Sequence, residues 1–329
     1  MPTPRLLLAL VLVLGPVAAA ASACGGGEDD ARGGGGPAAG SLRVLDRIPL
    51  PERPGGVAVG EGAVWTTDPL AGELLRLDPA SEAVDDRFSV ARAATSVAVG
   101  AGSVWVADPV ASVIVRVDPS SGEVVARVPV GTPGDLVYGF DAVWVVQGGP
   151  GAVVRIDPRT NRVVARILLG APASLSVGPT GVWVVDRSEG EVVRVDPDRN
   201  RVVARLEIGD FRGAAWVIAG GPAAWAAVSS PEQSGLARID ARTNDVLGLL
   251  PVSRERFGLL RAGAADARSV WIVAQVHVAR IDPGTNRITG SVRASRFRRP
   301  APADPRYADL GAAAVDGGSL WVAEPSTPA

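Results

Sequence analysis

Residues 97 to 131, VAVGAGSVWVADPVASVIVRVDPSSGEVVARVPVG, show the hydrophobic pattern that the chain repeats after residue 40. Four short apolar runs, rich in β-branched residues, are separated by turn residues such as Gly100-Ala101-Gly102 and Asp108-Pro109. Apolar runs of this length between Gly, Pro and Asp turns predict β-strands. The stretch therefore predicts four antiparallel strands, which is the pattern of one blade of a β-propeller.

A tryptophan marks the period of this repeat. It recurs every 39 to 50 residues, at Trp65, Trp105, Trp144, Trp183, Trp225, Trp271 and Trp321. An Arg-x-Asp pair recurs with it, with arginines at Arg76, Arg116, Arg155, Arg194, Arg238 and Arg280. Repeats of ~40–45 residues with four strands each indicate a radial propeller. We therefore expect an all-β fold, a seven-bladed β-propeller over residues 41 to 329. Its tryptophans should pack between sheets, and its repeated aspartates should accept backbone N–H bonds in the turns.

The two ends of the propeller segment predict how the ring closes. Leu42 to Leu50 has the pattern of an outer strand without a blade of its own, whereas the last unit supplies only Ala312 to Val315 and Leu320 to Ala323. We expect the N-terminal strand to complete the last blade, which removes exposed sheet edges. One strand stays unassigned, because no Arg-x-Asp segment follows Trp321. Either the closing blade has three strands or the reading frame ends early.

The first 40 residues predict an export signal and a tether. Residues 1 to 23 combine Arg5, an apolar run from Leu6 to Leu14 and a series of small residues, as in a signal peptide. Ala21-Ser22-Ala23-Cys24 resembles a bacterial lipobox, so Cys24 is the expected lipidation site and residues 24 to 40 a Gly-rich flexible tether. The alternative is cleavage after the Ala-x-Ala-like site and secretion. We expect an extracytoplasmic protein, anchored to the cell membrane as a lipoprotein.

Insertions in blades five to seven predict a binding face. They fall in connections that share one face of the disc, and rigid scaffolds usually carry binding residues on such loops. The two longest insertions are basic and contain aromatic rings, and their candidate contacts are Arg254, Phe257, Phe297, Arg299 and Tyr307. Guanidinium groups beside rings can hold a carboxylate or phosphate. The alternative is a set of solvated loops, rich in Arg because the chain contains no Lys.

Catalytic and metal-binding chemistry is sparse in this sequence. His277 is the single histidine and lies in a predicted third strand, where packing or surface roles are more common than catalysis. Acidic residues follow the blade tryptophans by three positions at Asp68, Asp108, Asp186 and Glu324, with Gln147 in blade three. Their carboxylates could bind a cation, but we favour the interpretation that each carboxylate caps its local turn. The net charge of -2 gives no reason to expect nucleic acid, and we expect no cofactor.

The repeats Gly-Ala-Val-Trp-Val-x-Asp and Val-x-Arg-[Val/Ile]-Asp-Pro-x-Thr-Asn resemble the virginiamycin B (streptogramin) lyase-like and YVTN-repeat propeller group. The resemblance runs from about residue 42 to 324 and implies the seven-bladed fold. The lyase branch uses a His general base and a magnesium ion bound by acidic residues. Only His277 could serve as that base, and no acid lies two residues from it on its own strand face. Lyase activity is therefore not carried over, and the YVTN side implies secreted binding proteins.

The sequence thus predicts a non-catalytic, extracytoplasmic β-propeller lipoprotein, monomeric, that binds a small anionic ligand or an envelope protein. One alternative is a lactone-cleaving lyase or hydrolase that uses His277. Another is a structural scaffold in a cell-envelope complex.

Overall fold

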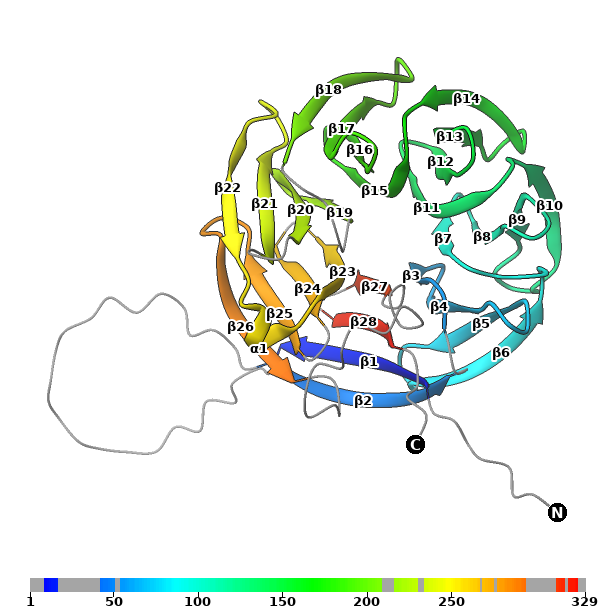
Figure 1. Cartoon of the computed structure of the whole chain (residues 1–329). Coiled ribbons are helices and arrows are strands. Elements are labelled where there is room, and N and C mark those ends of the chain that lie inside the picture. The colour runs from blue at the N-terminus through cyan, green and yellow to red at the C-terminus, as the bar shows by residue number, and fades with distance from the viewer. Residues whose placement is uncertain are drawn as a thin grey trace, which may run out of the picture.

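The computed structural model describes residues 9–16, 42–50, 54–208, 216–229, 234–266, 268–274, 277–293, 312–316 and 319–324. Apart from one helical turn, its regular elements in these residues are β-strands. The strands form four-stranded antiparallel sheets arranged around a central axis (Figure 1), so the fold is an all-β propeller. Six sheets are built from consecutive strands, and each contains one of the first six marker tryptophans.

Blades one to three follow the predicted order, with the first strand nearest the axis. Blade one contains β3 (Val57–Gly60), β4 (Ala63–Asp68), β5 (Glu73–Asp78) and β6 (Ala83–Ser89). Blade two contains β7 (Val97–Gly100), β8 (Ser103–Asp108), β9 (Val113–Val117) and β10 (Val124–Pro129). Blade three contains β11 (Pro133–Gly139), β12 (Ala142–Gln147), β13 (Ala152–Asp157) and β14 (Arg162–Leu168).

Blades four to six repeat this arrangement, and blade six is preceded by the helical turn α1 (Arg254–Phe257). Blade four contains β15 (Pro172–Gly178), β16 (Gly181–Asp186), β17 (Glu191–Asp196) and β18 (Arg201–Glu207). Blade five contains β19 (Val217–Gly220), β20 (Ala223–Ser229), β21 (Ser234–Asp240) and β22 (Val246–Pro251). Blade six contains β23 (Leu260–Ala265), β24 (Val270–Ala274), β25 (His277–Asp282) and β26 (Arg287–Arg293).

A further sheet, which we call the seam sheet, combines strands from both ends of the chain. Its order is β2 (Leu42–Leu50), β1 (Ala9–Pro16), β28 (Ser319–Glu324) and β27 (Ala312–Asp316). The expectation of seven blades of one kind is wrong in its count, because six blades are built from consecutive strands and this sheet is assembled from the two ends of the chain. Leu42–Leu50 is its outer strand. The unassigned third position holds Ala9–Pro16, which the sequence had placed in a signal peptide, because an apolar run of this kind fits a strand as well as a leader.

The marker tryptophans form the packing layer between blades. Those of blades one to six are at most 1% exposed. In blades one to three the indole Nε1 also donates a hydrogen bond to a carbonyl at the end of the first strand: Trp65 to Gly60, Trp105 to Gly100 and Trp144 to Gly139, at 3.0, 3.1 and 3.0 Å. Gly100 has no room for a side chain, since a Cβ there would collide with the Tyr138 ring of the next blade. Close approach of the inner strands thus requires glycine at this position.

The repeated Arg-x-Asp pair links each blade to its own turn and, in three blades, to its neighbour. The aspartates accept backbone N–H bonds, for example Asp118 from Ser120 and Ser121 at 2.9 and 3.0 Å. Hydrogen bonds from the Ser120 hydroxyl and these amides lower the pKa of Asp118 to about 2. The arginines of blades two to four donate to a turn carbonyl and an asparagine of the next blade, as Arg155 does to Pro197 O and Asn200 Oδ1, at 2.7 and 2.9 Å.

Candidate functional site

A cationic cluster lies where the connections of blade six converge, and we call it the blade-six cluster. It consists of Arg256, Phe257, His277, Ser291 and Arg293. Arg256 and Phe257 come from α1, in the connection between blades five and six, His277 opens β25, and Ser291 and Arg293 end β26. His277 and Arg293 are direct cross-strand partners, so the two strands place both side chains at the same edge of the blade.

The helical turn that carries Arg256 is fixed by its first residue. The Phe257 amide donates to Ser253 O at 2.9 Å, and the Arg256 amide donates to Ser253 Oγ at 3.3 Å. A serine at the start of a helical turn satisfies an otherwise unpaired N–H in this way. Gly258 follows with φ of 78°, a conformation that favours glycine and ends the turn.

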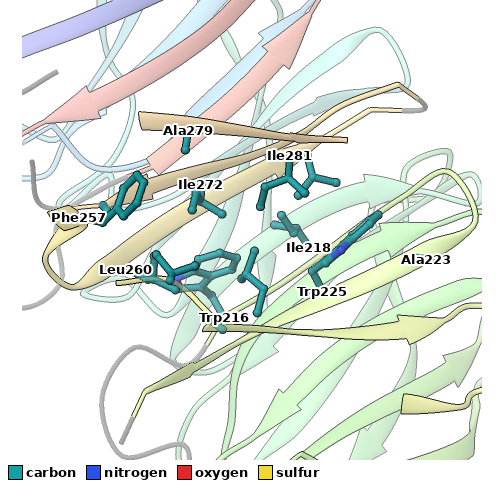
Figure 2. Packing of buried hydrophobic residues seen from close by; sticks show 14 residues of the cluster. Trp216, Ile218, Ala223, Trp225, Phe257, Leu260, Ile272, Ala279 and Ile281 are labelled. Atoms are coloured by element: carbon teal, nitrogen blue, oxygen red, sulfur yellow. The ribbon is translucent and has the colours of Figure 1, made fainter. Parts of the chain in front are cut away.

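Phe257 anchors the cluster in the hydrophobic core. Its side chain is 2% exposed and belongs to the same buried group as Trp216, Leu260 and Ile272 (Figure 2). The ring meets His277 edge-on, with centroids 5.5 Å apart and an interplanar angle of 66°. The guanidinium carbon of Arg256 lies 5.1 Å from the Phe257 centroid. Phe257 is therefore a buried support for its neighbours and not the exposed ligand contact that the sequence predicted.

Arg256 is exposed and held toward β26 by a hydrogen bond from its Nη2 to Ser291 Oγ at 3.2 Å. Burial lowers the pKa of His277, and the positive charges of Arg256 and Arg293 lower it further. The surroundings therefore favour the neutral imidazole. Its Nδ1 is buried and has no hydrogen-bond partner among the described residues. Two exposed arginines thus flank a partly buried imidazole, an arrangement suited to an anion.

The other residues that the sequence predicted as ligand contacts are not among the residues of the blade-six cluster. Arg254 begins α1, so its backbone is next to the cluster. Phe297, Arg299 and Tyr307 lie outside the described residues, in the segment that connects Arg293 of β26 to Ala312 of β27. Arg256, Ser291 and Arg293 were not among the predicted site residues. Only the cross-strand register of Arg293 with His277 could have indicated them, and the sequence does not give that register.

The acidic series after the blade tryptophans makes turn and loop contacts. Asp68 accepts from the Leu70 and Ala71 amides at 2.9 and 3.1 Å. Asp108, which is fully buried, accepts from the Arg92 amide of the incoming interblade connection at 2.7 Å and from Ala111 at 2.9 Å.

Asp186, also fully buried, has the same role in blade four. Burial acts to raise the pKa of Asp186, but hydrogen bonds from Ala171, Ser188 and Gly170 outweigh it and hold that pKa below its ordinary value. Gln147 accepts from Arg166 Nη1 at 2.6 Å. The backbone of Glu324 ends β28, and its side chain lies outside the description. Within the described ranges no three His, Cys, Asp or Glu side chains group as metal ligands would.

One more carboxylate, Asp135, lies on β11, the innermost strand of blade three. Its Oδ1 accepts from Ser96 Oγ of the blade-two side at 3.5 Å, and its Oδ2 accepts from the Leu175 amide of blade four at 3.3 Å. Burial raises the pKa of Asp135 to about 6, against the opposing effect of hydrogen bonds from Leu175, Leu136, Ser96 and Ser174. Asp135 therefore connects three blades near the axis and titrates close to neutral pH.

The comparisons with known proteins identify the fold. No family model and no curated protein sequence matches the chain. Among solved structures, a streptogramin B lyase is similar with a TM-score of 0.66 and 17% identity, over 84% of this chain and 91% of the lyase. BamB from Moraxella catarrhalis is similar with a TM-score of 0.55 and 13% identity, over 85% of this chain and 86% of BamB. The WD40 domain of Toxoplasma gondii coronin is similar with a TM-score of 0.63 and 13% identity, over 83% of this chain and 81% of the coronin chain.

These similarities support the β-propeller that the repeats predicted. At such identities they carry the fold and not the activity. Across the described residues, no helix has the length and apolar character needed to cross a membrane.

Proposed function

We propose that this protein is an extracytoplasmic, lipid-anchored β-propeller that binds a small anionic ligand without catalysis, at the blade-six cluster. In this proposal the seam sheet serves as the seventh blade and closes the ring. The observation that carries the binding site is the meeting of Arg256 and Arg293 around His277 at one corner.

The charge balance of the corner supports an anion as its ligand. Besides burial, the positive charges of Arg256 and Arg293 lower the pKa of His277, as a positive local potential does. A carboxylate or phosphate bound beside Arg256 would lower this potential.

The same surroundings favour binding over elimination chemistry. A general base is most effective with a pKa near the working pH, and a neighbouring carboxylate usually orients it. The charges that shift the pKa of His277 come from Arg256 and Arg293, and both push it below its ordinary value. The lyase alternative therefore lacks support from the geometry of its single candidate base.

The N-terminal sequence supports the proposed location. Cys24 is the only cysteine, and it follows small residues after an apolar run, in the lipobox-like context already described. The Gly-rich residues that follow supply the reach that an anchored propeller needs. Replacement of Cys24 by Ser should shift the protein from the membrane fraction to the soluble extracytoplasmic fraction, and an unchanged membrane fraction would contradict the lipid anchor.

Calorimetric titration with citrate and with inorganic phosphate tests the binding site. We expect saturable binding of at least one of these probes by the wild-type protein and at least tenfold weaker binding by Arg256→Ala. Arg287→Ala is the matched control, because Arg287 is an exposed arginine at the other end of β26. Equal loss in both variants, or binding in neither the variants nor the wild type, would contradict the assignment.

A further inference from the structure

The seam sheet departs from the other six at one register position. In every blade of consecutive strands, the marker tryptophan lies directly across from the arginine of the third strand, as Trp144 does from Arg155. In the seam sheet, Trp321 lies across from Val13 of β1. The third position is therefore filled by a strand that lacks the residue common to that position elsewhere.

The outer wall of this position, β2, packs on both neighbouring blades in addition to its pairing with β1. Ile48 and Leu50 of β2 are buried in one core cluster with Val57, Leu75 and other residues of blade one. Leu42, at the other end of the same strand, is buried in a cluster with blade-six residues. The outer strand thus has contacts with both neighbouring blades that do not involve β1.

The inner wall is equally well supported. Leu320 and Val322 of β28 are fully buried and pack with Ala262, Trp271 and other residues of blade six. Neighbouring strands in a sheet lie about 4.8 Å apart, so β2 and β28 are separated by roughly twice that distance. They are too far apart to bond one another, and each presents a free edge to the space between them when β1 is absent. This space is one strand wide, with hydrogen-bonding groups along both sides.

Blade one, which follows the seam sheet around the ring, indicates which residue a strand in the third position of the seam sheet should carry across from Trp321. The arginines Arg116, Arg155 and Arg194 donate to an asparagine that stands four residues after the next blade's turn aspartate. In blade one, the residue four after Asp78 is Glu82. Its φ of 54° matches the 56° of Asn161, so the two residues occupy equivalent turn positions. An arginine across from Trp321 would therefore meet a carboxylate where blades three to five provide an asparagine amide.

We propose that the third position of the seam sheet is a strand-acceptor site for a partner protein. Ala9–Pro16 occupies it in the uncleaved chain. After removal of the leader, the space between β2 and β28 binds an extended partner segment, antiparallel to both walls, with apolar residues on either side of an arginine across from Trp321. The inference rests on the leader being removed, as the proposed function requires, and it is independent of the anion site.

The uncleaved and processed chains provide the test. Uncleaved chain is made without export, and processed chain is purified from the membrane with its N-terminus defined by mass spectrometry. The probe is a labelled peptide GEVVRVDP, which copies residues 190–197 of the blade-four third strand. Its two controls carry Ala in place of Arg194, or Pro in place of Val193, which removes a backbone donor.

We expect the processed chain to bind the probe at least tenfold more tightly than the uncleaved chain, and at least fivefold more tightly than it binds the Ala peptide. The Pro peptide should bind at least tenfold more weakly than the probe. The variant Val13→Pro of the uncleaved chain should gain binding, because proline disrupts the pairing of β1 without removing it. The variant Glu82→Gln of the processed chain should reduce the preference for Arg over Ala to less than twofold.

Equal binding of probe and Pro peptide, or equal binding by both forms of the chain, would overturn the strand-acceptor site. A leader retained after export would overturn this site and the proposed anchoring together. A cleaved leader with no peptide binding would overturn the acceptor site alone.

Discussion

Arg155 links two blades of the propeller through Asn200, with its Nη1 2.9 Å from Asn200 Oδ1. The same guanidinium lies 5.3 Å from the Trp144 ring centroid. One repeated arginine thus joins the tryptophan of its own blade to the turn of the next. The arginines of blades two to four all make this pair of contacts, so three interfaces between blades use both the repeated Arg and the repeated Trp.

Replacement of Arg155 by Ala should therefore destabilise the propeller by about 2 kcal/mol, because charged hydrogen bonds and a cation–π contact are lost together. Urea unfolding monitored by tryptophan fluorescence measures the change. Arg162→Ala is the control, since Arg162 is an exposed arginine of the same blade; it should shift the free energy of unfolding by less than about 0.5 kcal/mol. Equal effects of the two substitutions would show that the link between blades does not contribute.

The indole hydrogen bond provides a second contrast. Trp144 and Trp183 are both fully buried, but only the Nε1 of Trp144 has a described partner, the Gly139 carbonyl. Trp144→Phe should consequently cost about 1 kcal/mol more than Trp183→Phe, which removes an unsatisfied donor. The two free energies of unfolding can be compared in the same denaturant. A larger loss in Trp183→Phe would contradict the role of the Gly139 contact.

Asp135 should make stability depend on pH near neutrality. Burial raises its folded-state pKa to about 6, above the ordinary 3.8, so the fold favours the protonated carboxyl. This contribution is fully present below pH 3.8 and is lost as the pH rises through 6. Asp135→Asn should therefore raise the melting temperature at pH 7.5 and flatten its dependence between pH 4 and 6.5. At the higher pH the gain should be on the order of 1–3 kcal/mol.

The matched substitution for this titration is Asp118→Asn, at a turn carboxylate whose pKa is lowered to about 2. It should leave the profile between pH 4 and 6.5 unchanged, because stability from a lowered carboxyl pKa is lost only as the pH falls below its ordinary value. A wild-type profile that stays flat from pH 4 to 6.5 would be inconsistent with the burial of Asp135.

Phe257 should act through packing. Phe257→Ala removes a buried ring from the core and should destabilise the protein by about 3 kcal/mol. Phe257→Leu retains most of the buried volume and should keep both the fold and the anion affinity within about threefold, at a cost below about 1.5 kcal/mol. Thermal unfolding and the citrate titration together check both variants. A stable Phe257→Leu protein that no longer binds citrate would restore this residue as a direct contact.

The strands of each blade could be predicted from the sequence, because each repeat contains its own apolar runs and turn residues. The apolar runs around Trp105 and the turn at Asp118 predict four strands and one hairpin without knowledge of any other blade. The predicted role of the turn aspartates is confirmed by the N–H bonds at Asp118. Blades one to four, which lack insertions, follow the expected pattern most closely.

Features that depend on distant pairing could not be predicted in this way. The strand formed by Ala9–Pro16 has the same apolar composition as a leader, and only its register with β2 and β28 distinguishes the two. The proximity of Arg256 to His277 depends on how α1 packs against β25 and β26. The burial of Phe257 follows from the same packing, whereas its position in a basic insertion favoured an exposed interpretation.

His277 provides the most direct test of the proposed binding site, because the chain contains one histidine and its NMR signal needs no assignment. The measurement is the pH titration of its Cε1 proton in protein purified without a histidine tag, with and without citrate. Without ligand, the pKa should lie below its ordinary value, because of burial and the positive charges of Arg256 and Arg293. Bound citrate should raise that pKa by at least half a unit, and Arg256→Ala should raise the ligand-free pKa and abolish the response. A titration curve that is the same with and without saturating citrate or phosphate would contradict an anion site at this cluster.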